Sequence, residues 1–89
     1  MQTETKKKLI RRLKVIEGQI RGLQKMVDDE KYCIDIITQS SAVRHSIGSF
    51  EKGLLEGHIA TCTVAQIKNG QHSKAVDEIV SVYKLAKKK

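Results

Sequence analysis

The 89-residue sequence contains no proline and no tryptophan, and it has only two tyrosines and one phenylalanine. Without proline, glycine is the only strong helix breaker, so long helices meet few interruptions. So few aromatic rings make a poor platform for stacking unpaired bases, which argues against a single-strand or RNA reader. No apolar run is long enough to cross a bilayer, and the N-terminus shows no secretory signal. We therefore expect a cytoplasmic protein with no membrane partner.

Cysteine is also scarce, since Cys33 and Cys62 are the only two in the chain. In the reducing cytoplasm they are expected to be free thiols rather than a structural disulfide. Two thiols are too few for a four-cysteine zinc module within one chain. The pair is therefore available for metal binding or for redox chemistry.

Acidic residues are outnumbered by basic ones, ten against seventeen, which gives a net charge of +7. This surplus favours an anionic partner, with nucleic acid ahead of an acidic membrane surface. Because stacking residues are few, duplex DNA held through its phosphates is the better match. Charge alone does not distinguish this from a basic protein that binds no nucleic acid.

The spacing of apolar residues predicts an all-α fold. Steps of four and three residues in the first third predict a helix over residues 5–28, and the apolar positions are Leu9, Leu13, Ile16, Ile20, Leu23 and Val27. The acidic residues at 28–30 suit the N-terminus of a second helix, so a turn is expected near 28–31. That helix is expected to continue past Cys62 to a stop at 68–70, with Gly70 as a left-handed cap. A shorter third helix, capped by Ser73, is expected to follow.

Two long helices and one short helix cannot enclose much apolar surface in a monomer. A two-helix hairpin leaves its apolar stripe half open, and self-association is the expected remedy. We therefore predict a single domain over residues 1–89 that forms an antiparallel four-helix-bundle dimer. Two such dimers are expected to pair into a tetramer.

His58 and Cys62 are four residues apart, which places both side chains on one face of a helix. Alone this spacing is a weak signal, because a half-buried histidine beside a small core thiol would match it equally well. Cys33 lies 25 residues before His58, or ~37 Å along one continuous helix. One chain cannot bring the three side chains to a common ion unless that helix breaks, whereas two antiparallel copies could. The candidate break points are Gly48, Gly53 and Gly57.

Several short motifs resemble the copper-sensing repressors of the CsoR/RcnR family. They are Tyr32-Cys33, His58 with Cys62 three residues further on, Arg12-Leu13, and the stretches 16–22 and 37–39. The resemblance covers nearly the whole chain. It implies that Cys33, His58 and Cys62 bind Cu(I), one ion per chain bridging two subunits. It also places Tyr32 and Glu78 beside the site, and it implies a regulator without catalytic residues rather than an enzyme.

The donor set agrees with copper. Two thiolates and one imidazole form a soft three-coordinate set, which suits Cu(I), whereas zinc normally takes a fourth ligand. Nickel and cobalt members of the family add nitrogen ligands near the N-terminus, but the first histidine of this chain is His45. His72 would supply a fourth ligand to zinc, so zinc stays open.

The resemblance also implies double-stranded operator DNA as the partner, bound by basic faces of the assembled tetramer. Residues 6–14 carry six basic side chains and no acid, although a solvated helix face would show the same run. Arg12 matches a contact position of the family, and Ser49 stands where copper sensors often carry a basic residue. The predicted contacts are Lys7, Lys8, Arg11, Arg12, Lys14, Arg21, Arg44 and Lys52.

The predicted function is a repressor that binds its operator without metal and is released by Cu(I), so that copper-resistance genes are derepressed. One alternative is a repressor that senses sulfane sulfur by linking Cys33 to Cys62 through sulfur, which would not need His58. Another is a small thiol redox enzyme in which His58 activates a cysteine. A third is a helical adaptor in which neither cysteine matters.

Overall fold

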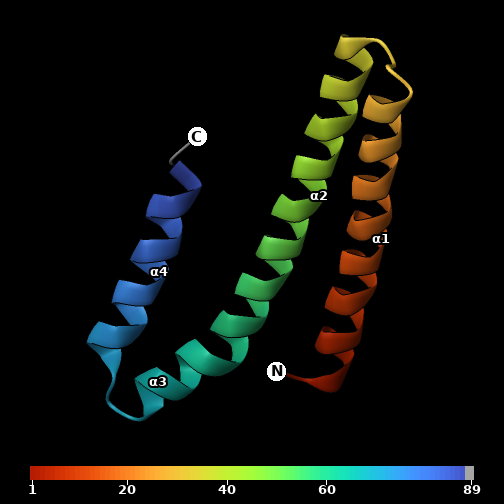
Figure 1. Cartoon of the computed structure of the whole chain (residues 1–89). Coiled ribbons are helices and arrows are strands. Elements are labelled where there is room, and N and C mark those ends of the chain that lie inside the picture. Colours follow the sequence, from red (N-terminus) through yellow and green to blue (C-terminus); the bar gives the residue numbers. More distant parts are fainter. Residues whose placement is uncertain (88–89) are drawn as a thin grey trace. The chain divides into compact units, whose positions relative to one another are not determined.

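The computed structural model describes residues 1–87, and every regular element in them is helical. The order is α1 (Thr3–Asp28), α2 (Cys33–His58), the π-helical turn η1 (Ile59–Thr63), α3 (Val64–Lys68) and α4 (His72–Lys87) (Figure 1). Because α2, η1 and α3 follow without a loop, the predicted two long helical stretches and one short helix are confirmed. Within these residues no helix is both long and apolar enough to cross a membrane.

The backbone divides into two compact units, Met1–Leu55 and Glu56–Lys89. Residues 88–89 lie outside the described residues. The single domain expected over 1–89 stays a prediction.

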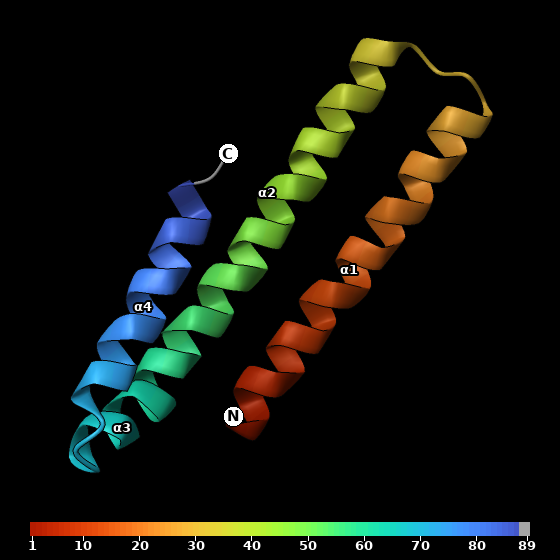
Figure 2. The ribbon, with the colours of Figure 1, turned by 60° about the vertical axis from the view of Figure 1, so that its left-hand side comes forward.

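In the first unit, α1 and residues 33–55 of α2 run antiparallel and side by side (Figures 1 and 2). Leu9 and Ile16 of α1 and Val43 of α2 form its buried core. Gly53 leaves room for this packing, since Leu9 Cδ2 lies 3.6 Å from the position that a Cβ of Gly53 would take. Two residues of the predicted α1 stripe therefore make the contact with α2.

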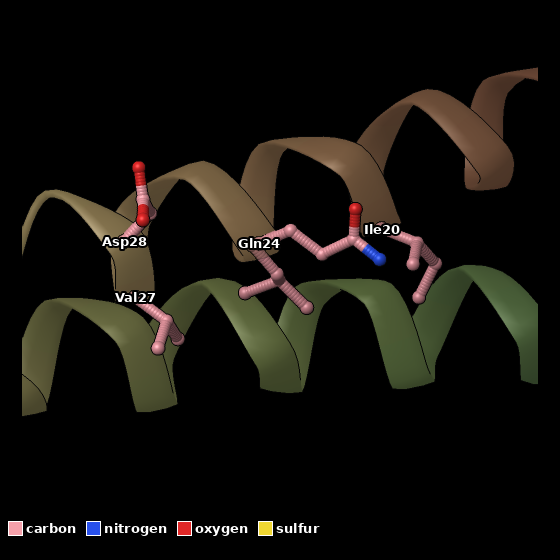
Figure 3. A pocket seen from close by; sticks show the side chains of 5 residues that line it. Ile20, Gln24, Val27 and Asp28 are labelled. Atoms are coloured by element: carbon pink, nitrogen blue, oxygen red, sulfur yellow. The ribbon is translucent and has the colours of Figure 1, made fainter.

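Much of the remaining α1 stripe is exposed, including Leu13, Ile20 and Val27. Near the end of α1 a hollow of about 460 Å³ is lined by Ile20, Leu23, Gln24, Val27 and Asp28. Figure 3 shows Asp28 pointing away from the α2 ribbon, with Ile20 and Val27 pointing to its side. A hairpin has no third element to cover this stripe, so apolar surface remains available for association.

The turn between α1 and α2 differs from the prediction. We expected the second helix to begin near residues 28–31, but α1 continues to Asp28 and α2 begins at Cys33. The N–H of Asp29 donates to the Lys25 carbonyl at 2.8 Å, and its carboxylate pairs with Lys25 Nζ at 3.2 Å. This cation offsets the unfavourable dipole that acidic residues meet at a helix C-terminus. Glu30 completes the turn with a φ of 52°.

In the second unit, α3 packs against α4, and Thr63 and Ala75 are its buried residues. The chain reverses at Gly70, whose φ of 78° confirms the predicted left-handed cap. The predicted cap at Ser73 is wrong, because α4 already begins at His72. The Gln71 carbonyl instead accepts the N–H of Ala75 at 3.1 Å and closes the first turn of α4.

Candidate functional site

His58 and Cys62 lie together where α2 gives way to the π-helical turn. His58 is the last residue of α2, and Cys62 belongs to η1. Four residues are close to one full turn in either type of helix, so both side chains lie on the same side of the backbone. The His58 side chain is 31% exposed, and Cys62 is an exposed free thiol. Both groups can therefore be reached by an ion.

The π-helical turn itself was missed by the sequence analysis, which predicted uninterrupted α-helix here. In η1 the backbone bonds span five residues instead of four, a geometry that occurs mostly as single turns and often at functional sites. The hydroxyl of Thr61 donates to the Gly57 carbonyl at 2.8 Å, which gives that carbonyl a side-chain partner next to the widened turn. The sequence of residues 59–63 carries no pattern that separates a π-turn from an α-helix.

Gln66 is the second feature that sequence reasoning missed. In a regular helix, eight residues after His58 would place Gln66 roughly 80° away around the axis. The extra residue that η1 accommodates turns Gln66 back by about 100°, onto the side of His58. Residues 58, 62 and 66 follow each other at steps of four. This spacing places all three side chains on one face of the helix only if the π-helical turn is present.

Glu78 of α4 lies between these two side chains. Gln66 Nε2 donates to Glu78 Oε1 at 2.5 Å, and His58 Nε2 lies 3.9 Å from the same oxygen. The structure thus places Glu78 beside His58, as the family resemblance implied, and adds Gln66 as the residue that holds the carboxylate. The distance from His58 is longer than a hydrogen bond. Glu78 is therefore near the imidazole without being engaged by it.

Tyr32 and Cys33 belong to the first unit. Tyr32 is exposed and directly precedes α2, and its carbonyl accepts the N–H groups of Asp35 and Ile36 at 3.0 and 3.2 Å. Cys33 is exposed at the first position of α2. Within residues 1–87, no three histidine, cysteine or acidic side chains lie close enough together to hold a metal ion. His72 therefore does not complete a ligand set with His58 and Cys62 in this part of the chain. His58 and Cys62 belong to the second unit, whereas Cys33 belongs to the first.

A basic groove of about 660 Å³ lies between α1 and α2 in the first unit. Three of the predicted DNA contacts line it, namely Lys8, Arg11 and Arg12, and no acidic residue does. The remaining lining residues are Val15, Ile16, His45, Ser46 and Ser49. The lining therefore combines three basic side chains with small polar and apolar ones.

The other predicted DNA contacts lie outside this lining, and all are exposed. Lys52 follows His45 and Ser49 on one stripe of α2, at steps of four and three residues, and so extends the groove side. Arg21 pairs with Glu17 at 3.1 Å. Lys7 and Lys14 are exposed on α1, and Arg44 on α2. His45, which the sequence analysis did not connect with DNA, joins the groove.

Residues 5–84 match the model of the metal-sensitive transcriptional repressor family. The copper-sensing transcriptional repressor CsoR of Bacillus subtilis is 40% identical over 82 residues, which are 92% of this chain and 81% of that protein. The copper-sensing repressor RicR of Mycobacterium tuberculosis is 38% identical over 68 residues, 76% of this chain and 71% of its own. The crystal structure of the copper-sensing repressor CsoR with Cu(I) from Geobacillus thermodenitrificans has a TM-score of 0.91 and 39% identity, covering 99% and 92% of the two chains.

The chain therefore belongs to the metal-sensitive transcriptional repressor family. This confirms the resemblance drawn from the sequence, together with the all-helical fold class. The family is one of transcriptional repressors and not of enzymes.

Proposed function

We propose that this protein is a cytoplasmic Cu(I)-sensing transcriptional repressor. It binds operator DNA in the metal-free form and is released by copper, so that copper-resistance genes are derepressed. The observation that carries the proposal is the His58–Cys62 pair at the α2–η1 junction, with Glu78 3.9 Å from His58, in a chain whose relatives are named copper-sensing repressors.

The third ligand, Cys33, has to come from a second chain. Within the first unit, α2 is uninterrupted from Cys33 to Leu55, a rise of ~33 Å over 22 residues. His58 comes three positions after Leu55, and even a fully extended chain spans at most ~11 Å over three positions. The Cα atoms of Cys33 and His58 in one chain are therefore at least ~22 Å apart, whatever the placement of the two units. Ligands of one copper ion lie within ~5 Å of each other.

Two chains packed antiparallel would bring Cys33 of one to His58 and Cys62 of the other. A two-fold dimer built in this way has two equal sites, hence one Cu(I) per chain bridging two subunits. The exposed apolar stripe of α1 supports a four-helix-bundle dimer, because a second hairpin would cover it. Pairing of two dimers into a tetramer is part of the same proposal, as is one metal-responsive domain over residues 1–89.

The donor set fits Cu(I), since two thiolates and one imidazole suit a soft ion of low coordination number. His58 directs Nε2 toward Glu78, which leaves Nδ1 for the metal. When bound, copper would supply a soft Lewis acid that links the two chains. The other imidazole nitrogen would then carry its proton toward Glu78, in the way that metal-bound histidines usually meet a carboxylate. Tyr32 would reach the same site beside Cys33 of the second chain.

Glu78 connects the metal ligands to α4. The carboxylate is held by Gln66 and stands just beyond hydrogen-bond distance from His58. Fixing the imidazole on a metal would favour a hydrogen bond between His58 and Glu78. An interaction present in one state and absent in the other is what allosteric coupling requires. We propose that this contact transmits the copper signal to α4.

Operator DNA would bind at the basic groove of the first unit and along the basic residues beside it. Lys8, Arg11 and Arg12 line the groove, and Lys52 extends its α2 side. Lys7, Lys14 and Arg21 would add phosphate contacts along α1. The groove has no acidic lining that would repel the backbone.

The proposal is tested by titrating a fluorescent duplex with the full chain under reducing conditions. A duplex recovered from a random-sequence pool by the metal-free protein serves as the probe. One equivalent of Cu(I) per chain should weaken binding by about tenfold or more, the usual range of allosteric coupling. Unchanged or tighter binding with Cu(I) would contradict the proposed function.

Replacing Gln66 tests whether its hydrogen bond to Glu78 supports the copper site. Gln66→Ala should lower Cu(I) affinity by about 10-fold to 100-fold, because Gln66 holds Glu78 beside His58, and losing the group that orients a metal-bound histidine has effects of this size. Affinity for DNA without metal should stay the same. Competition with a Cu(I) chelator measures the change, and Gln71→Ala, an exposed glutamine of the same unit, is the control. Equal Cu(I) affinities of the two variants would show that Glu78 does not depend on Gln66.

A further inference from the structure

One side chain of the basic groove can change its charge near neutral pH. It is His45, which is exposed on α2 and lines the groove together with Ser46 and Ser49. The other charges of the lining come from α1, and we call them the α1 cations: Lys8, Arg11 and Arg12. Histidine is the side chain whose ordinary titration falls between pH 5 and 8. The charge of the groove therefore varies with pH through His45.

No acidic side chain lines the groove around His45. Glu51 lies six residues further along α2, about 120° away around the helix axis. Glu17 of α1 already pairs with an arginine of its own helix at 3.1 Å. Glu4 lies on the N-terminal side of the contact between α1 and Gly53, which is eight residues or ~12 Å from His45 along α2. Within the described residues, His45 thus has no carboxylate in the groove and takes part in no ion pair.

The charges that face His45 are basic. The α1 cations line the opposite side of the groove, and Lys52 lies two turns further along α2 on the same side as His45. Arg44 lies about 100° away around the helix axis. A DNA phosphate held by the α1 cations would therefore meet the imidazole as the titratable group across the groove.

The protonation state of the imidazole decides how it meets a phosphate. Neutral imidazole carries a lone pair on one ring nitrogen, which a phosphate oxygen repels, whereas protonated imidazole donates from both nitrogens. Hydrogen bonds between charged partners are also about twice as strong as neutral ones. A nearby anion in turn favours the protonated form. Phosphate binding and protonation of His45 should therefore promote each other.

The other polar groups on the α2 side of the groove are neutral. The hydroxyl of Ser46 donates to the Ala42 carbonyl at 3.1 Å, so its proton is already used. Ser49 lies one turn after His45 and is half-buried. Of the α2 residues that line the groove, only His45 can bring a positive charge to a phosphate.

We propose that His45 contacts a DNA phosphate in its protonated form, so that operator binding takes up a proton. The inference deepens the proposed function and rests on it, because the groove is the DNA surface proposed above. The DNA-bound state holds more protons than the free state, so the affinity for DNA falls as the pH rises. Repression would then weaken at alkaline pH without any change in copper.

The pH dependence of DNA binding tests the role of His45. Fluorescence anisotropy of the duplex recovered from the random-sequence pool is measured with the metal-free full chain in reductant, at constant ionic strength. The wild type should bind about threefold to tenfold more weakly at pH 8 than at pH 6, the range for one titrating group. His45→Gln should bind nearly equally at both pH values, at the wild-type level of pH 8. His45→Arg, which keeps its charge, should bind at pH 8 at least as tightly as the wild type binds at pH 6.

His72→Gln is the matched control, because it removes an exposed histidine of the second unit and should keep the wild-type pH dependence. Calorimetry in two buffers of different ionisation enthalpy gives a second readout, with uptake of a fraction of a proton in the wild type and none in His45→Gln. Equal wild-type affinities at the two pH values, or an unaltered pH dependence in His45→Gln, would overturn the inference and leave the proposed function standing. A chain that binds no duplex at either pH would overturn both. Since no copper is present, a failed copper response leaves the role of His45 standing.

Discussion

Replacing Cys33 by serine should leave DNA binding of the metal-free protein unchanged and abolish the effect of Cu(I) on it. A serine hydroxyl is a hard, protonated donor and does not replace a thiolate at a soft ion. Cys33 lies at the start of α2, far from the basic groove in sequence, so the fold of the DNA-binding unit should persist. Fluorescence anisotropy with and without one equivalent of Cu(I) measures both effects. The expected weakening of about tenfold in the wild type should disappear.

His58→Ala should lose the copper response as completely as Cys33→Ser, because the imidazole is one of the three proposed ligands. His72→Ala, an exposed histidine at the start of α4, should respond like the wild type. A His58→Ala protein that kept its full response to inducer would favour the sulfane-sulfur sensor, whose chemistry needs only the two thiols. A lost response in His72→Ala would point to a four-ligand zinc site instead.

Removing two groove charges should weaken operator binding and flatten its salt dependence. The Arg11→Ala/Arg12→Ala double variant should bind about 10-fold to 100-fold more weakly at moderate salt, and the slope of log affinity against log salt should fall by about 2. Each lost phosphate contact releases one counterion fewer. Cu(I) affinity should be unchanged, because none of the proposed copper ligands lines the groove.

Lys25→Ala serves as the matched control for the groove. Lys25 is an exposed charge on the same helix that pairs with Asp29 and does not line the groove. Its slope and affinity should stay close to those of the wild type. If the double variant and this control gave the same slope, the basic groove would not be the DNA interface.

The sequence predicted the helices well where a regular stripe of apolar residues defined them. The stripe from Leu9 to Val27 predicted α1 to within two residues of its start, and Gly70 marked the turn before α4. The start of α2 was wrong because the dipole argument for residues 28–30 weighed one local preference. The hydrogen bond and ion pair between Asp29 and Lys25 outweigh that preference. Such pairings appear only once the turn has a conformation.

The sequence predicted the candidate metal ligands, but it did not predict the residue that holds Glu78 beside them. The spacing of His58 and Cys62, with the length of helix expected after Cys33, already favoured a site shared with a second chain. The place of Gln66 beside Glu78 depends on the extra residue in η1, and no composition or periodicity predicts a π-turn.

The most direct measurement mixes two inactive chains. Cys33→Ser and Cys62→Ser proteins are unfolded together in equal amounts, refolded, and assayed for Cu(I) sites by chelator competition, with each variant alone as reference. Half of the resulting dimers are mixed and each has one intact site of two, so the mixture should recover about a quarter of the wild-type sites. No recovery, or a complete three-ligand copper site in a monomer, would contradict a site shared between two chains.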